Sequence, residues 1–298
     1  MIPYFCGLGN WIRIPRILLR LLFTASLLIA LACQAPAAPV RFDGQRAYAH
    51  VKAQCDVGPR PTGSKALEQT GDYILDELKK QGWATEEQRF TYRGTPVRNL
   101  IGQAGKGPLL IVGAHYDTRR RADQDPVDPS APVLGANDGA SGVAVLLELA
   151  RCLEKKRLGH EVWLVFFDAE DHGDLDGWEW IVGSTYFAEH LTRTPQAVII
   201  ADMVGDKDQQ IYKEHNSDPM LQDRLWAIAA DLGYETFIPE VKWAMFDDHT
   251  PFLQRGIPAV DIIDFDYPFW HTRQDTLDKV SAKSLERVGR VLEVFVEG

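Results

Sequence analysis

The chain alternates between short apolar runs and segments whose apolar residues recur with helical spacing. Four runs are almost entirely apolar, as strands buried on both faces of a sheet are; they cover residues 109–115, 162–167, 197–203 and 259–263. Helical patterns cover residues 45–55, 64–81, 139–155, 184–191, 220–232 and 282–296. This alternation predicts a single three-layer α/β/α domain with a mixed, mostly parallel central sheet.

The first 38 residues differ from the rest of the chain. Three arginines precede an apolar run over residues 21–32, and small residues follow it. This pattern is typical of an export signal, and the run is shorter than the ~20 residues of a membrane span. An uncleaved anchor is the alternative, and Cys33 follows a segment that resembles a lipobox. We expect residues 1–38 to be a signal peptide or lipoprotein signal with a linker, ahead of one domain over residues 39–298.

That organisation places the domain outside the cytoplasm. It would be periplasmic, secreted or a membrane-anchored lipoprotein, and it would touch a membrane only through the N-terminal segment or a lipid. Cys55 and Cys152 would then form either one disulfide or two free thiols.

Composition narrows the class of protein further. The chain has 298 residues, of which 45% are hydrophobic and 25% charged, as in an ordinary globular protein. Lys and Arg total 32 against 42 Asp and Glu, which gives a net charge of -10. Nucleic acid is excluded as a partner on this ground, because phosphate binding needs a basic patch. No cysteine pair has zinc-finger spacing, so His and carboxylates must hold any metal.

Residues able to bind a metal stand at the ends of the predicted buried strands. In open α/β sheets, ligands gather outside the carboxyl ends of the strands. Converging His nitrogens and carboxylate oxygens form a site suited to zinc. The residues in these positions are His115, Asp138, Glu170, Asp171, Asp202 and His271.

Taken singly, most of these residues have a structural explanation. Asp138 before a glycine could cap a helix, His115 could be a hydrogen-bonded core residue, and His271 could serve packing. Asp202 is different, because a carboxylate inside an apolar strand needs a partner or a ligand. Because all six residues stand at the ends of predicted strands, and in this order along the chain, we interpret them as one functional site.

The ordered set resembles the zinc aminopeptidases, and also the glutaminyl-peptide cyclotransferases that share their fold, over about residues 44–298. The stretch Asn-Asp-Gly-Ala-Ser-Gly at 137–142 is its most specific part. The resemblance implies a zinc-dependent catalytic domain in which Asp138, Asp171 and His271 bind zinc and Glu170 is the general acid and base. One difference is that family members usually have Glu where this chain has Asp171, so the metal would lie closer to the backbone.

The resemblance leaves two enzymatic activities open. His115 and Asp202, with Asp138 bridging, match the second metal site of the dinuclear aminopeptidases. Three features favour the cyclotransferases: Asp247 in a double Asp before His249, Trp270 beside the last ligand, and Trp178 in a segment like the cyclase pocket loop. Core packing is the alternative explanation for both tryptophans.

In the cyclotransferase interpretation, one Zn²⁺ polarises the side-chain carbonyl of an N-terminal Gln and Glu170 transfers the proton. Asp202 and Asp247 orient the reacting groups, and Trp178 and Trp270 wall the substrate pocket. The products are pyroglutamate and ammonia.

In the aminopeptidase alternative, two zinc ions activate a water. A third possibility is an inactive ectodomain that binds a partner, against which the intact ligand set argues. We expect peptide or protein N-termini as substrates and a monomeric protein. Residues 118–133 are expected to form a mobile surface loop.

Overall fold

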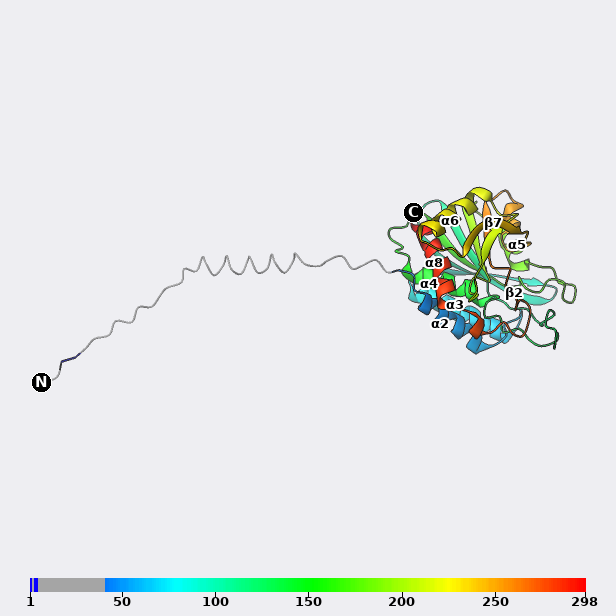
Figure 1. Ribbon diagram of the computed structural model, residues 1–298, viewed down its shortest axis with the longest axis horizontal. Coiled ribbons are helices and arrows are strands. Elements are labelled where there is room, and N and C mark those ends of the chain that lie inside the picture. The colour runs from blue at the N-terminus through cyan, green and yellow to red at the C-terminus, as the bar shows by residue number, and fades with distance from the viewer. Residues whose placement is uncertain (2, 5–40) are drawn as a thin grey trace. The chain divides into compact units, whose positions relative to one another are not determined.

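The computed structural model describes residues 1, 3, 4 and 41–298 (Figure 1). The predicted signal segment and Cys33 therefore lie outside the described residues. Within the described part, no helix combines the length and hydropathy that crossing a membrane requires. Cys55 and Cys152 are both free thiols.

A six-stranded sheet runs through the centre of the domain in the order β1-β2-β4-β3-β5-β8. Strands β4, β3, β5 and β8 are parallel neighbours, whereas β1 and β2 are added antiparallel at one edge. This confirms the mixed, mostly parallel sheet. The strands are β1 (Ala84–Tyr92), β2 (Thr95–Gly105), β3 (Leu109–His115), β4 (Glu161–Phe167), β5 (Ala197–Asp202) and β8 (Ala259–Ile263).

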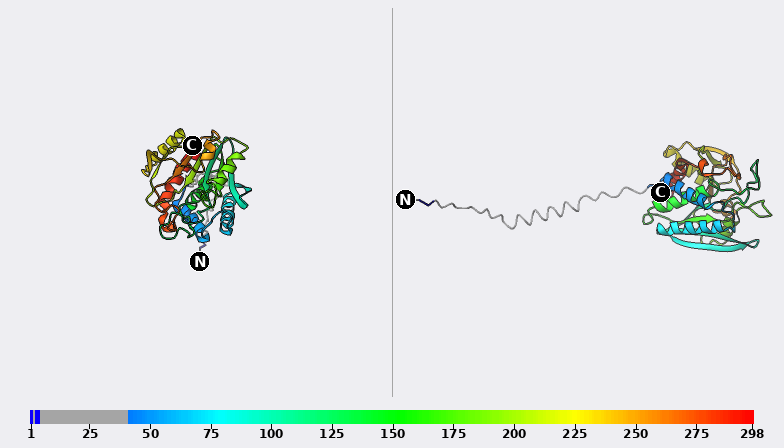
Figure 2. Two further views of the ribbon diagram at one scale, coloured as in Figure 1. Left: turned by 90° about the vertical axis from the view of Figure 1, so that its right-hand side faces the viewer. Right: turned by 90° about the horizontal axis from the view of Figure 1, so that it is seen from below.

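Helices cover both faces of the sheet (Figures 1 and 2). In β3, Leu110 and Val112 point into the larger helical layer, whereas Ile111 points to the opposite face. Residues that alternate in this way bury a strand on both sides, which explains the continuous apolar runs. The larger layer holds α2 (Gly44–Val57), α3 (Lys65–Lys80), α4 (Ala140–Cys152), α6 (Pro219–Asp231) and α8 (Ala282–Glu297), and the other layer holds α5 (Val182–Glu189) and α7 (Thr250–Leu253).

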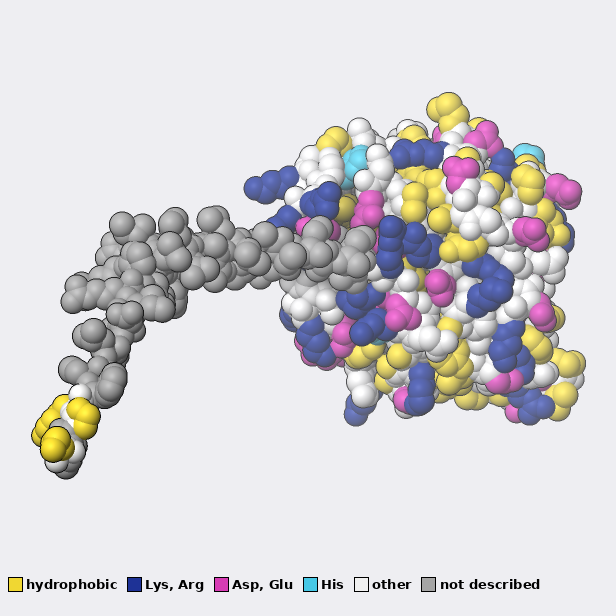
Figure 3. Space-filling model, turned by 60° about the vertical axis from the view of Figure 1, so that its left-hand side comes forward, with side chains coloured by type: hydrophobic (Ala, Val, Ile, Leu, Met, Phe, Trp, Pro, Cys, Tyr) yellow, Lys and Arg dark blue, Asp and Glu magenta, His cyan; other side chains and the backbone are white. Residues whose placement is uncertain are grey.

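The sequence patterns did not predict two elements. The β1–β2 hairpin lies beside α3 (Figure 2). Because β1 alternates between exposed and half-buried residues, it contains no apolar run that would predict a strand. A small parallel sheet pairs β6 (Ile211–Glu214) with β7 (Phe237–Trp243), and most of β7 is exposed. Charged side chains of both signs are interspersed over the face drawn in Figure 3.

Arg60 fastens the loop that leads to α4. It is fully buried, and its guanidinium donates to four backbone carbonyls rather than to a carboxylate. Two of these belong to Leu134 and Gly135, both at 2.9 Å, just before the candidate ligand Asp138. The other two belong to Gln54 and Gly58 at 3.3 and 3.1 Å.

Replacing Arg60 with Met should lower the free energy of unfolding by about 3 kcal/mol, because four carbonyls, two buried and two partly buried, would lose their donor. Urea denaturation measures the change. Arg157→Met is the matched control, since the Arg157 side chain is 79% exposed and should unfold like the wild type. Equal midpoints for both variants would contradict the role given to Arg60.

Candidate functional site

Asp138 stands just before α4, where a buried hydrogen-bond network holds its backbone. The N–H groups of Asn137 and Asp138 donate to the two carboxylate oxygens of Asp275 at 2.9 and 3.1 Å, and the Tyr267 hydroxyl donates to the same carboxylate at 2.7 Å. Burial and the nearby Asp138 carboxylate raise the pKa of Asp275 to about 7. The Asp138 side chain is thereby directed toward the ends of the strands.

Asp138, Asp171 and His271 come together as one potential metal site, here called trio A. His271 Nε2 lies 2.9 Å from Asp171 Oδ1 and 3.6 Å from Asp138 Oδ2. All three residues are buried, and Asp171 Oδ1 pairs with His271, yet Asp138 Oδ2 and Asp171 Oδ2 have no hydrogen-bond partner. Unpaired buried carboxylates are costly, so trio A fits a cation. Two carboxylates and one imidazole are a donor set typical of zinc.

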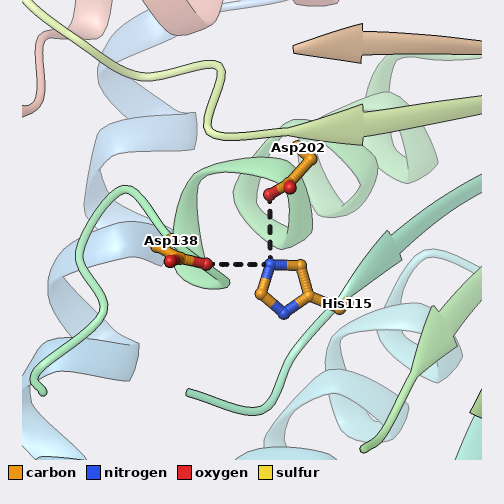
Figure 4. Close-up of side chains that lie close together, drawn as sticks. All are labelled: His115, Asp138 and Asp202. Atoms are coloured by element: carbon orange, nitrogen blue, oxygen red, sulfur yellow. Dashed lines mark hydrogen bonds and ion pairs between the residues drawn. The ribbon is translucent and has the colours of Figure 1, made fainter. Parts of the chain in front are cut away.

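His115, Asp138 and Asp202 form a second group, trio B, which shares Asp138 with trio A (Figure 4). His115 Nε2 lies 3.1 Å from Asp202 Oδ1 and 3.2 Å from Asp138 Oδ1. Asp138 therefore presents one oxygen to each trio. Burial lowers the pKa of His115, but Asp202, Asp117 and Asp138 outweigh it and raise that pKa well above its usual value. A raised pKa favours the protonated form of His115, which would pair with both carboxylates of trio B.

Glu170 follows β4 and reaches the same cavity as the trios. Its backbone N–H and that of Asp171 donate to the Asp117 carboxylate at 3.1 and 3.2 Å. Burial, with the charges of Asp247 and Asp171, raises the pKa of Glu170 well above its usual value, although His115 opposes the shift. A carboxyl group with a raised pKa is suited to accepting and returning a proton near neutral pH.

Three residues at the site have left-handed backbone conformations. The φ angles are +61° at Ala169, +44° at Met203 and +54° at His271, and none of these residues is a glycine. Such conformations cost energy and collect at functional sites. Ala169 directly precedes Glu170, Met203 directly follows Asp202, and His271 is itself a site residue.

A cavity of about 180 Å³ opens over the two trios. Its walls are largely aromatic and aliphatic, and its acidic groups are close together, as in many small-molecule sites. The apolar walls are Trp180, Met203, Met245, Phe246, Ile263, Phe265 and Trp270; the polar lining is Asp138, Glu170, Asp171, Asp202, Asp247 and His271.

Comparison with known proteins identifies the family of this chain. The family described as Peptidase family M28 matches residues 99–296. The chain belongs to this family. M28 membership agrees with the predicted zinc-enzyme resemblance and with the fold, which solved exopeptidases and glutaminyl cyclases share.

The relatives of this M28 chain include both glutaminyl cyclases and aminopeptidases. A glutaminyl cyclase structure from Porphyromonas gingivalis is 34% identical with a TM-score of 0.81, covering 87% of this chain and 99% of the other. A leucine aminopeptidase precursor from Bacteroides thetaiotaomicron is 32% identical with a TM-score of 0.82, covering 87% and 98%. The bovine glutaminyl-peptide cyclotransferase-like protein is 28% identical over 80% of this chain and 71% of its own length. The family and these relatives support an enzymatic role for the chain.

The two tryptophans expected in the pocket have different positions. Trp270 lines the cavity and stacks on His271 with ring centroids 3.7 Å apart. Trp178 is not among the lining residues; it is buried and packs against Tyr92 and His172. Trp180 lines the cavity instead and stacks parallel to His271 at 5.9 Å. The two tryptophans lie in an irregular segment of turns, so their spacing in the sequence did not show which of them faces the cavity.

Arg119 is a site residue that the sequence patterns missed. Its guanidinium is buried, pairs with both oxygens of Asp123 at 2.9 Å, and lies 4.7 Å above the Trp180 ring. It also donates to the carbonyls of Asp171 at 3.2 Å and Gly173 at 2.8 Å. The first part of the 118–133 segment is therefore packed into the site, contrary to the expected surface loop. The only signal in the sequence was three consecutive arginines soon after His115.

Arg119 should govern metal affinity in this M28 chain. Asp123, its partner, lies 3.6 Å from His271 Nδ1, so Arg119 braces two ligands of trio A. Replacing it with Met should weaken zinc binding by about tenfold or more, as for other outer-shell partners of metal ligands. Competition with a chromogenic chelator measures the affinity.

The control for that measurement is Arg121→Met, which removes a guanidinium that is 41% exposed and pairs with Asp176. It should keep the wild-type affinity. Equal affinities for all three proteins would show that Arg119 does not position the ligands.

Proposed function

We propose that this chain is a zinc-dependent glutaminyl-peptide cyclotransferase that converts the N-terminal Gln of peptides or proteins to pyroglutamate and releases ammonia. The observation that carries the proposal is the difference between the two trios. In trio A one oxygen of Asp138 and one of Asp171 have no partner, although His271 pairs with the other Asp171 oxygen, whereas in trio B both carboxylates lie within 3.2 Å of His115 Nε2. This difference favours one metal ion in trio A and a proton on His115 in trio B. Cyclisation requires no second metal, because it does not need an activated water.

Trio A would hold the metal, with Asp138, Asp171 and His271 as its ligands. When bound there, zinc would supply a Lewis acid that polarises the side-chain carbonyl of the substrate Gln. The two stacked tryptophans, Trp180 and Trp270, keep the His271 ring in one orientation. Ligands held in this way need little rearrangement during the reaction.

Glu170 would carry the proton through both halves of the reaction. It accepts a proton from the α-amine, whose nitrogen then forms a bond to the side-chain carbonyl carbon. It returns that proton to the amide nitrogen as the carbon–nitrogen bond breaks, and ammonia leaves. One carboxylate serves as base and then as acid, which needs a pKa nearer neutrality than that of an exposed Glu. Burial supplies that shift.

Asp202 and Asp247 would orient the amine and the leaving group from the other side of the cavity. Burial and the neighbouring carboxylates of Asp202 and Asp248 raise the pKa of Asp247 well above its usual value, which favours the protonated form that can donate a hydrogen bond. The aromatic walls exclude water from a cavity that fits one uncharged side chain. Exclusion of water favours attack by the substrate amine over hydrolysis.

An aminopeptidase with two zinc ions is the second candidate. The geometry of trio B and the similarity to the leucine aminopeptidase precursor favour it. There Asp138 would bridge the two metals, with His115 and Asp202 as the further ligands, and Glu170 would act as base for a water.

The proposal also includes export, with residues 1–38 as the signal and linker and 39–298 as the catalytic domain acting as a monomer. The signal-like pattern of the N-terminal segment supports it. Substrates would then be peptide or protein N-termini outside the cytoplasm.

Purified protein should convert a Gln-initiated peptide to its pyroglutamyl form with one ammonia per turnover. Glu170→Gln should lower kcat/KM by about 10³-fold, the usual contribution of a positioned acid and base, and should leave zinc bound. Mass spectrometry and an ammonia assay give the readout, with elemental analysis for zinc. Glu179→Gln, an exposed Glu in the same segment, is the matched control and should keep full activity.

Other outcomes would support the other candidates. Hydrolysis of a Leu-aminoacyl chromogenic substrate without cyclisation of Gln would establish the aminopeptidase. An inactive protein that binds no zinc but captures a partner would support the ectodomain interpretation. Full activity of Glu170→Gln would refute the role of Glu170.

A further inference from the structure

A second hollow lies beside the active-site cavity and shares a wall with it. The two have Met245 and Phe246 in common. The second hollow has a volume of about 450 Å³ and is here called the outer groove; its lining is Asn216, Ala244, Met245, Phe246, Thr250, Leu253 and Gln254. Phe246 is 59% exposed, so the shared wall reaches the surface at the rim of the cavity.

Other hollows in the described part of the chain do not share this position. One is lined by residues 63–68 with Arg89 and Arg98, and another by residues 233–236 with 283–287. Neither shares a residue with the active-site cavity. A substrate chain that leaves the cavity over Phe246 therefore enters the outer groove directly.

The shared wall is held firmly from behind. Glu214, at the end of β6 and 1% exposed, accepts a hydrogen bond from the Met245 N–H at 2.7 Å. The same carboxylate accepts from the N–H of Asn216 at 2.9 Å, and Asn216 Nδ2 donates to the Met245 carbonyl at 2.8 Å. Both backbone polar groups of Met245 are thus occupied. A wall fixed in this way is preformed for binding, which lowers the entropy cost of association.

The lining of the outer groove carries no charged residue, although the chain as a whole has a net charge of -10. Ala244, Met245, Phe246 and Leu253 provide apolar surface, and Asn216, Thr250 and Gln254 provide neutral polar groups. Apolar surface with a few polar groups is typical of ligand pockets, and about 450 Å³ lies within their usual size range. The chemistry matches uncharged peptide residues.

We propose that the outer groove binds the second and third residues of a peptide whose first residue occupies the active-site cavity, and that it selects apolar side chains there. This inference rests on the proposed function in one respect, namely that the cavity receives a peptide N-terminus. It adds a substrate class, which is peptides with an N-terminal Gln followed by apolar residues.

Four substrates test the groove: Gln-Phe-Leu amide, Gln-Gly-Gly amide, Gln-Glu-Glu amide and Gln amide. Wild-type kcat/KM for Gln-Phe-Leu amide should exceed that for Gln-Gly-Gly amide by about tenfold, because apolar side chains are buried. Gln254→Arg should raise kcat/KM for Gln-Glu-Glu amide by about threefold, as expected for a partly exposed ion pair. Gln amide does not reach the groove, so its turnover reports on the active-site cavity alone.

Gln69→Arg is the matched control, since Gln69 is exposed on α3 and does not line the groove. Gln69→Arg should leave kcat/KM for all four substrates at the wild-type values. Equal kcat/KM for all three tripeptides, or the same response from Gln69→Arg and Gln254→Arg, would overturn the proposal.

The proposed function and the groove can fail separately. Turnover of Gln amide tests the function alone. If no Gln substrate is cyclised, binding of Ala-Phe-Leu amide and Ala-Gly-Gly amide, followed by the fluorescence of Trp180 and Trp270, still tests the groove. A Kd about fivefold lower for the apolar peptide supports it, and equal Kd values refute it.

Discussion

The carboxylate of Asp138 connects the two halves of the site, because each of its oxygens faces a different group of ligands. Everything else that we describe depends on its position. The sheet brings His115, Asp171 and Asp202 to the carboxyl ends of three neighbouring strands, but Asp138 comes from a loop. That loop is held by Arg60 through backbone carbonyls and by Asp275 through backbone N–H groups. The sheet therefore positions three of the five candidate ligands, buried polar contacts fix Asp138, and His271 comes from the segment that follows β8.

The acid excess of the chain is important only where carboxylates are buried together. Burial raises the pKa values of Glu170, Asp171 and Asp247. A cation in trio A would offset part of this negative charge, whereas most of the other Asp and Glu residues lie at the surface. The site thus places trio A, whose unpartnered oxygens suit a metal ion, beside Glu170 and Asp247, whose raised pKa values favour the protonated form. This division matches a reaction that needs a Lewis acid and a proton carrier in the same small cavity.

The sequence predicted the parts of the fold that are buried on both sides. The apolar run at 109–115 forms β3, and the helical pattern at 64–81 forms α3, which Ser64 caps by accepting from the Leu67 N–H. The β1–β2 hairpin was missed because β1 is half exposed and carries no apolar run. His115, Asp171 and Asp202 were singled out because they stand at or soon after strand ends, whereas Asp138 was singled out by the Asn-Asp-Gly-Ala-Ser-Gly stretch. Arg119 and Asp275 were not, because their contacts join residues far apart in the chain and leave no local pattern. Trp180 was confused with Trp178 because spacing alone does not show which side of a loop faces the cavity.

The account rests on one metal ion in trio A and a proton in trio B. Crystals of the zinc-loaded protein, measured on either side of the zinc absorption edge, locate every bound zinc. We expect one anomalous peak among Asp138, Asp171 and His271, with His115 still hydrogen-bonded to Asp202. Two peaks of equal height bridged by Asp138 would contradict the account and establish the dinuclear site of an aminopeptidase.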